Sequence, residues 1–256
     1  MDTTALSALV DKVLGAGRRA GEAALDAVMP PQCLACGASV DRHGGLCAAC
    51  FGKAVFITRP YCRICGLPVQ SFSDDDVTCG ACLRDRPAYR QARAVLVYNE
   101  TGKSLVLALK HADRTDLASH LAGWMMREGA DIVRGCDVIV PVPMHRRRLW
   151  LRTYNQAALL ARALAKCAQR PMLPTDLIRA RATPSQGRLD RAARRRNVAG
   201  AFKVIRPAAV RGKAILLVDD VLTTGATADS CARALLRAGA VAVDVLVLAR
   251  VPAPGA

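Results

Sequence analysis

The sequence predicts an α/β protein in which a mainly parallel sheet, flanked by helices, follows a small cysteine-rich module and an N-terminal helix. Apolar runs without alternation, such as residues 214–218, are typical of strands buried on both faces. Helical stretches separate these runs through the second half of the chain, which favours parallel pairing. Eight of the 11 cysteines form four Cys-x-x-Cys pairs before residue 83. We therefore expect three parts: an N-terminal helix (1–29), a cysteine module (30–87) and an α/β domain (88–256).

Local patterns place the elements along the chain. Leu6, Leu9 and Val13 recur at helical spacing, and Pro30 with Pro31 ends the first helix. The expected strands are 93–98, 137–142, 177–181, 213–218 and 241–248. The expected helices are 4–28, 105–110, 117–126, 154–168 and 226–238. Ligands of parallel sheets bind outside the carboxyl ends of the strands, so residues 141–143 and 219–220 are candidates.

Composition and charge restrict the class of protein. Hydrophobic residues make up 52% of the 256 positions and aromatic residues only 4%, which indicates a globular core of Ala, Leu and Val. No apolar run approaches the roughly 20 residues that span a bilayer, and the N-terminus lacks the apolar region of a signal peptide. We therefore predict a cytoplasmic protein without a transmembrane segment. The formal net charge of +16 favours a polyanionic partner, with a solvated basic surface as the plainer alternative.

The four cysteine pairs predict two structural zinc ions. A two-residue gap lets both thiolates of a pair face one metal, and two pairs complete a tetrahedral site. Sequential pairing would join the first two pairs and the last two, while interleaved pairing stays open. A disulfide framework or an iron–sulfur cluster is less favoured, because no secretory signal is seen and isolated pairs repeat regularly. The expected ligands are Cys33, Cys36, Cys47, Cys50, Cys62, Cys65, Cys79 and Cys82.

The residues that follow the apolar run 214–218 predict a site for a ribose phosphate. Asp219 and Asp220 stand at its carboxyl end, where carboxylates can bind sugar hydroxyls or a hydrated Mg²⁺. A short turn then leads into the helix expected at 226–238, whose first N–H groups attract an anion. The turn consists of Thr223, Thr224, Gly225, Ala226 and Thr227. The alternative is an ordinary strand-to-helix turn in which Asp and Thr serve as caps.

A second strand end is followed by arginines. Val142 and Pro143 close the strand expected at 137–142, and the basic residues after them could bind a second anion. These residues are Arg147, Arg148 and Arg152. A longer segment, 179–203, holds eight Lys or Arg against one acid. This basic segment could contact nucleic acid, or it could close over the site as a lid that excludes water.

Residues 215–227 resemble the 5-phosphoribosyl-1-pyrophosphate (PRPP) binding motif of type I phosphoribosyltransferases. That motif is an aliphatic strand, two acids, two aliphatic residues and then Thr-Thr-Gly-x-Thr, and every position is filled here. The resemblance implies that Asp219 and Asp220 are the catalytic acids that hold the ribose, with Mg²⁺, and that the turn binds the 5-phosphate. It also implies that the strand end at 142–143 binds the leaving pyrophosphate.

The chain as a whole resembles the ComF family of bacterial competence-related proteins, which join a double zinc ribbon to a type I phosphoribosyltransferase-like domain. The resemblance rests on the four cysteine pairs, on segments 109–111, 140–156 and 179–198, and on the ribose-phosphate motif. It assigns pyrophosphate binding to Val142, Pro143, Arg147, Arg148 and Arg152. It assigns the flexible loop to Arg181, Gln186, Arg195 and Asn197.

Two main functional hypotheses follow. The first is an enzyme that transfers a phosphoribosyl group from PRPP to an unknown nitrogen acceptor, since no purine or pyrimidine pocket can be read from the sequence. The second is a single-stranded DNA-binding protein of DNA uptake, in which the PRPP-type site senses a ligand and other DNA-uptake proteins are partners. A third hypothesis is an adaptor whose zinc module docks a partner protein.

Overall fold

The computed structural model describes residues 30–70, 77–109, 116–145, 149, 154–181 and 191–253, with the side chains of 191 and 192 excepted. The chain forms two compact units, Met1–Gly52 and Lys53–Ala256. The helix expected at 4–28 lies outside the described residues. The first two cysteine pairs belong to the first unit, whereas the last two pairs belong to the second unit together with the sheet.

The first unit is organised around its cysteines. The Cys33 N–H donates to the Ala38 carbonyl (2.7 Å), and the Gly37 N–H donates to the Cys33 carbonyl (3.0 Å). A short helix, α2 (Ala48–Lys53), buries no residue. Within residues 30–52 only Cys33 and Leu34 are buried. So small an apolar core cannot supply most of the folding free energy, and metal binding is the usual substitute.

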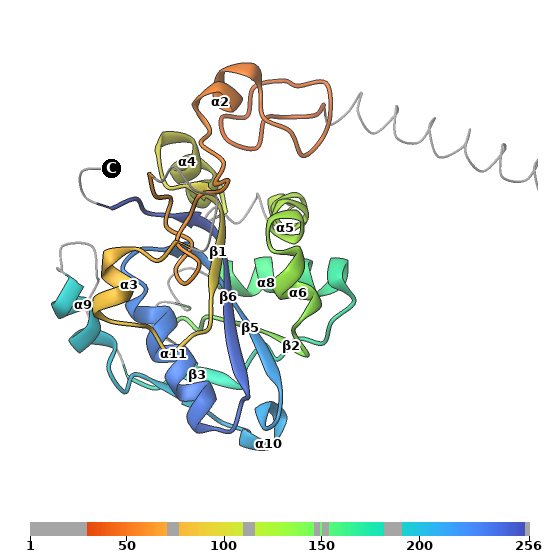
Figure 1. The fold of residues 1–256 in the computed structure, drawn as a ribbon. Coiled ribbons are helices and arrows are strands. Elements are labelled where there is room, and N and C mark those ends of the chain that lie inside the picture. The colour runs from red at the N-terminus through yellow and green to blue at the C-terminus, as the bar shows by residue number, and fades with distance from the viewer. Residues whose placement is uncertain are drawn as a thin grey trace, which may run out of the picture. The chain divides into compact units, whose positions relative to one another are not determined.

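Four parallel strands form the sheet of the second unit (Figure 1). They are β1 (Ala92–Val97), β2 (Val138–Pro141), β5 (Ala214–Leu222) and β6 (Ala242–Arg250). Their order across the sheet is β1-β6-β5-β2, and each neighbouring pair is parallel. Residues 215–218 and 243–249 are buried throughout, as expected for strands covered on both faces. The predicted mainly parallel sheet is confirmed, and its four carboxyl ends share one edge.

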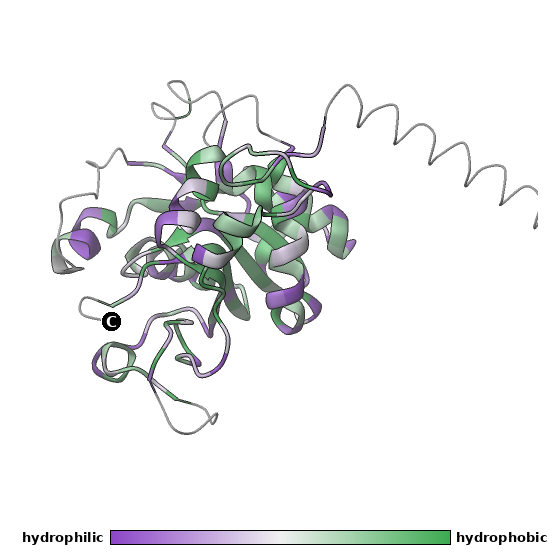
Figure 2. Ribbon diagram, turned by 90° about the horizontal axis from the view of Figure 1, so that it is seen from above, coloured by the Kyte–Doolittle hydropathy of each residue, from purple (hydrophilic) through white to green (hydrophobic). Residues whose placement is uncertain are grey.

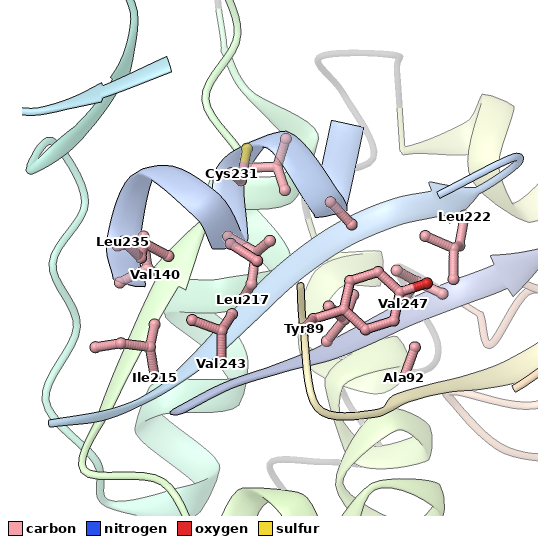
Figure 3. Packing of buried hydrophobic residues seen from close by; sticks show 14 of the residues in the cluster. Tyr89, Ala92, Val140, Ile215, Leu217, Leu222, Cys231, Leu235, Val243 and Val247 are labelled. Carbon is pink, nitrogen blue, oxygen red and sulfur yellow. The ribbon is translucent and has the colours of Figure 1, made fainter. Parts of the chain in front are cut away.

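Helices cover both faces of the sheet. α11 (Ala226–Arg237) lies on one face, where Cys231 and Leu235 pack with Leu217 and Val243 of the strands (Figure 3). α5 (Leu117–Glu128) and α8 (Gln156–Ala168) pack on the other face (Figure 1). Two further helices near the sheet are α4 (Glu100–Ala108) and α6 (Ala130–Arg134). Hydrophobic colour follows the strands in Figure 2. None of the helices that the structure describes has the length and apolarity needed to cross a membrane.

A small antiparallel sheet and a basic helix pack against α11. β3 (Leu177–Arg179) pairs with β4 (Phe202–Val204), which places Arg179 opposite Phe202. α9 (Arg191–Val198) lies between them in sequence, and α10 (Pro207–Val210) follows β4. The sequence patterns did not predict α6, α9, β4 or α10. Each is short, and α9 carries four arginines in eight residues, so neither periodicity nor apolar content marks it.

The strand predicted at 213–218 is too short. β5 continues to Leu222, so Asp219 and Asp220 lie within the strand and not after it. The ladder with β6 persists through these residues, since Asp219 pairs with Val247 and Leu222 pairs with Arg250. Both side chains are partly exposed, unlike those of residues 215–218 before them.

The last two cysteine pairs pack directly on the edge strand β1. The Ala92 N–H donates to the Ile64 carbonyl (2.8 Å), which joins the two segments through their backbones. Gly66 has φ 62°, and a Cβ at this position would lie 2.8 Å from the Ala92 carbonyl oxygen, so no other residue fits without rearrangement. α3 (Gly80–Arg84) carries the last cysteine of the group. The sheet and this cysteine module therefore share one core, which includes Cys62, Cys65 and Cys82.

Candidate functional site

The two strand ends predicted to bind the ligand lie side by side. β2 and β5 are neighbours, with Pro141 opposite Val218. The Val142 N–H donates to the Val218 carbonyl (2.8 Å), and Asp219 follows directly. The structure therefore brings Val142 and Pro143 next to the acid pair.

The Asp219 carboxyl is largely shielded from water. Strand alternation puts it on the same face as Leu217, which packs under α11. Burial, followed by the negative charge of Asp220, raises the pKa of Asp219 well above its usual range, and the nearby Arg179 guanidinium offsets only part of that shift. The Asp219 Oδ1 accepts a hydrogen bond from the Asp220 N–H (2.9 Å). A cation placed at this carboxyl would reverse the shift and stabilise its charged form.

Asp220 lies on the opposite face of β5, because successive residues of a strand alternate. Burial and then the charge of Asp220 raise the pKa of Tyr98, which directly follows β1. Both acids are only partly exposed. They are neighbours in sequence, but they would meet a ligand from different sides of the sheet edge.

Residues 223–227, here called the phosphate turn, connect β5 to the N-terminus of the 12-residue helix α11. Gly225 is the N-cap with φ 81°, and the Ala226 N–H donates to the Thr224 hydroxyl (3.4 Å). The positive φ favours glycine at this position, and a Cβ there would also lie close to the Tyr89 hydroxyl, at 3.1 Å. The first N–H groups of α11 and the hydroxyls of Thr223 and Thr224 can therefore turn toward a phosphate.

The segment after Pro143 is described only in part. Asn155 donates from Nδ2 to the Val142 carbonyl (3.0 Å), and its Oδ1 accepts the Ala157 N–H (3.1 Å) as the N-cap of α8. Asn155 thus ties the end of β2 to the start of α8, a role that the sequence analysis did not assign. Four predicted site residues lie outside the described ranges: Arg147, Arg148, Arg152 and Gln186.

The described part of the predicted flexible loop contacts neighbouring backbone and acids. Arg181 donates to the Asn197 carbonyl (3.1 Å). Arg195 of α9 forms an ion pair with Asp85 and lies 3.9 Å from the Asp229 carboxylate. In this arrangement Arg195 is held by Asp85, which follows α3, and lies near Asp229 of α11.

A pocket of about 650 Å³ has the phosphate turn as one wall. Its other walls come from the last two cysteine pairs, α3, α9 and the residues after β6. Tyr89 and Arg194 line it, but neither Asp219 nor Asp220 does. The phosphate turn is therefore shared between this pocket and the acid-bearing sheet edge.

The eight predicted metal ligands form two groups in sequential order. The first cysteine group is Cys33, Cys36, Cys47 and Cys50, and the second is Cys62, Cys65, Cys79 and Cys82. Within each group the sulfur atoms lie within 4.8 Å of one another. The Cys36–Cys47 and Cys65–Cys79 sulfur distances are both 3.7 Å, close to the edge of about 3.8 Å of a tetrahedron with Zn–S bonds of about 2.3 Å. Both groups fit a structural zinc ion.

The thiols of each group cannot all ionise without a cation. A hydrogen bond from Cys65 is the main reason that the pKa of Cys62 falls to about 4, whereas burial and then the charge of Cys62 raise the pKa of Cys82 to about 12. In the first group, backbone N–H groups led by that of Cys47 lower the pKa of Cys33 to about 6 despite desolvation, and burial raises the pKa of Cys50. A divalent cation at the centre removes this conflict.

Arg250 is a site residue that the sequence analysis missed. It ends β6 and is only 7% exposed. Its guanidinium donates to the carbonyls of Leu222 (3.0 Å), Thr223 and Val251 (2.8 Å). The signal available in the sequence was a lone arginine at the end of the mainly apolar run 242–249, because a buried arginine needs several acceptors.

Comparison with known proteins gives consistent matches. Residues 24–83 match the family model of the double zinc ribbon domain. The chain is 34% identical to the DNA utilization protein YhgH of Escherichia coli strain K12 over 213 residues, which cover 81% of this chain and 91% of that protein. It is 30% identical to Competence protein F of Haemophilus influenzae over 212 residues, covering 80% and 90%. It is 26% identical to Competence protein ComFC of Bacillus subtilis over 197 residues, covering 76% and 79%.

The fold and the cysteine groups define an α/β protein fused to a double zinc ribbon. With these relatives, the chain belongs to the ComF family of competence-related proteins. Among solved structures, glutamine phosphoribosylpyrophosphate amidotransferase from B. subtilis, complexed with ADP and GMP, aligns with 57% of this chain and 27% of its own chain. The identity is 25% and the TM-score is 0.34.

We expect metal analysis of the purified protein to return about two zinc ions per chain. Cys36→Ala and Cys65→Ala should each lower the count to about one, because the two cysteine groups share no ligand. Cys167→Ala, which changes an exposed thiol outside both groups, is the matched control and should retain both ions. Mass spectrometry of the metal content provides the measurement, and one ion or none in the unmodified protein would refute the two-site assignment.

Asp219→Asn should raise the free energy of unfolding at pH 8 by on the order of 1 kcal/mol. The raised pKa means that the folded state resists an ionisation that the unfolded state accepts, so the charged carboxyl destabilises the fold above the unfolded pKa of about 3.9. The gain should therefore shrink as the pH falls toward 5. Urea unfolding followed by circular dichroism measures it. Asp131→Asn, at a side chain that is 92% exposed, should change stability by less than about 0.5 kcal/mol. A less stable Asp219→Asn protein at pH 8 would contradict the explanation.

Proposed function

We propose that the protein binds PRPP, or a related ribose 5-phosphate, with Mg²⁺ at the carboxyl edge of the sheet, and that it transfers the phosphoribosyl group to a nitrogen acceptor. The observation that carries the proposal is the hydrogen bond from Val142 to Val218, which holds the end of β2 against the acid-bearing part of β5. Three neighbouring elements could then meet the 5-phosphate, the ribose and the pyrophosphate of one ligand. Membership of the ComF family supports this phosphoribosyltransferase-like interpretation.

Each element has a distinct task in this proposal. The phosphate turn binds the 5-phosphate through N–H groups and hydroxyls. Asp219 and Asp220 hold the ribose hydroxyls from the two sides of the sheet edge. Mg²⁺, when bound, neutralises charge on the pyrophosphate. Residues 142–143, with the arginines at 147, 148 and 152, stabilise the leaving pyrophosphate while the acceptor nitrogen forms its bond to C1′ and the C1′–oxygen bond breaks.

The basic segment would act as the lid. Arg181, Gln186, Arg195 and Asn197 belong to the proposed flexible loop, which excludes water from the reacting C1′. Arg195 would have to leave its ion pair with Asp85 in order to turn toward the ligand. The pair is more than one third exposed, so releasing it would cost about 1 kcal/mol or less.

Titration calorimetry with PRPP and Mg²⁺ should detect binding to the unmodified protein. The double variant Asp219→Asn/Asp220→Asn should bind at least 100-fold more weakly, a loss of about 2.7 kcal/mol, because the ribose loses both charged acceptors. Asp131→Asn, which removes one exposed carboxylate away from the proposed site, is the control and should bind normally. Release of pyrophosphate from PRPP, screened across nitrogen acceptors, then tests transfer itself. Equal binding by the double variant would refute the ribose assignment.

A second candidate function is binding of single-stranded DNA. The observation that favours it is the arginine-rich helix α9, on which the Arg196 side chain is exposed, in a chain with net charge +16. The names of two relatives, DNA utilization protein and competence protein, also favour a function that involves DNA. Few aromatic residues are available for base stacking, so contacts to phosphates would dominate.

We expect the affinity for a single-stranded oligonucleotide to fall steeply as salt rises. Arg196→Ala should make the slope of log K against log salt shallower by about 0.7, which is the value for one phosphate contact on a single strand. Arg162→Ala removes an equally exposed arginine on α8 and should leave the slope unchanged. Fluorescence anisotropy across a salt series gives these slopes, and a flat dependence would eliminate this candidate.

A further inference from the structure

Arg250 connects the second cysteine group to the phosphate turn. Its Nε donates to the Cys65 carbonyl (3.2 Å), and its Nη2 lies 3.8 Å from the Cys65 sulfur. Its Nη1 donates to the carbonyls of Leu222 and Thr223, where the chain leaves β5 and enters the turn. All these residues belong to the second unit. One buried side chain therefore contacts a metal ligand on one side and the proposed ligand site on the other.

The contact with Thr223 sets the direction of the turn. A peptide group is planar and trans, so its carbonyl and the N–H of the next residue point in opposite directions. By drawing the Thr223 carbonyl toward itself, Arg250 directs the Thr224 N–H away from the cysteine group. The same constraint applies to Leu222 and the N–H of Thr223. Two donors of the phosphate turn are thus oriented by one guanidinium.

The contact with Cys65 sets the position of the guanidinium. Four thiolates around Zn²⁺ leave two negative charges in excess, and a buried arginine beside one of the sulfurs is attracted by them. Without the metal, the thiolates repel one another, so the Cys65 sulfur no longer holds a fixed position beside the guanidinium. The first cysteine group belongs to the other compact unit, so it provides an internal control.

We propose that Arg250 is a positioning residue that couples metal occupancy of the second cysteine group to the order of the phosphate turn. Loss of that metal loosens the turn and weakens binding of a phosphate ligand, whereas loss of the metal from the first group does not. The ligand-binding part rests on the proposed function, but the order of the turn can be measured without any ligand.

Hydrogen–deuterium exchange of the zinc-loaded full chain tests the role of Arg250. Arg250→Lys keeps the charge but cannot reach the four carbonyls and the sulfur together, so amides 223–228 should exchange at least tenfold faster. Arg90→Lys is the matched control, because Arg90 forms a two-bond ion pair with Asp244 near the opposite end of β6. It should leave these amides unchanged. Equal exchange in Arg250→Lys and unmodified protein would overturn the proposal.

The metal arm uses Cys36→Ala, which removes the first site and leaves one zinc per chain. Chelation of that remaining zinc should accelerate exchange of amides 223–228 about as much as Arg250→Lys does, while far-UV circular dichroism of the sheet is retained. In the combined Cys36→Ala/Arg250→Lys protein, chelation should add little, because the connection is already broken. If chelation and Arg250→Lys each accelerate exchange by the same factor whether or not the other change is present, the two act independently and the coupling is wrong. If Arg250→Lys fails to fold, chelation of the zinc in Cys36→Ala still tests whether the metal affects exchange of amides 223–228.

Binding of PRPP with Mg²⁺ to Arg250→Lys separates the two proposals. We expect binding at least tenfold weaker than in the unmodified protein, with two zinc ions still present. If the unmodified protein binds no PRPP but exchange responds as predicted, the proposed function fails and the coupling survives. If PRPP binds equally well to both proteins and exchange is unchanged, the coupling fails and the proposed function survives.

Discussion

The parallel ladder of β2, β5 and β6 is the constraint on which the rest of the structure depends. Because all three strands run the same way, Val142, Asp219 and Arg250 reach the same edge of the sheet, although they are far apart in sequence. The strands are almost wholly apolar over most of their length, and their polar residues, apart from Asp244 near the start of β6, lie at that edge. Burial of the apolar part stabilises the fold and fixes the positions of the polar part. The register in which the three strands pair therefore determines which residues meet at the candidate site.

The second unit places several charged or ionisable groups in poor contact with water. Asp219 resists ionisation, the second cysteine group brings four thiols together, and Arg250 is almost fully buried. Each of these would destabilise an isolated fold unless a cation, a carbonyl or a ligand compensates it. Arg250 is compensated by backbone carbonyls, and both cysteine groups are arranged for a metal. For Asp219, the Asp220 N–H and the Arg179 guanidinium offset only part of the effect of burial, so its pKa stays raised.

Features encoded by nearby residues could be predicted from the sequence. The run 214–218, the turn Thr223–Thr227 and the Cys-x-x-Cys pairs each carry their signal within a few positions, and the sheet and both cysteine groups formed as expected. The extension of β5 through Asp219 and Asp220 was missed, because it depends on pairing with β6. α9 and β4 were missed because they are short and packed by α11. Apart from Val251, the partners of Arg250 lie 27 to 185 positions away, beyond the reach of any local pattern.

The order of the sheet also has a consequence for biosynthesis. β6 follows β1, β2 and β5 along the chain and leaves the ribosome after them, yet it lies between β1 and β5. Until it is inserted, β1 and β5 each present an unpaired backbone edge, and such edges pair with other chains. Nascent or truncated chains would therefore be both incapable of forming the ligand site and prone to aggregate. The sheet edge that carries Val142, Asp219 and Arg250 is therefore complete only after β6 has been inserted.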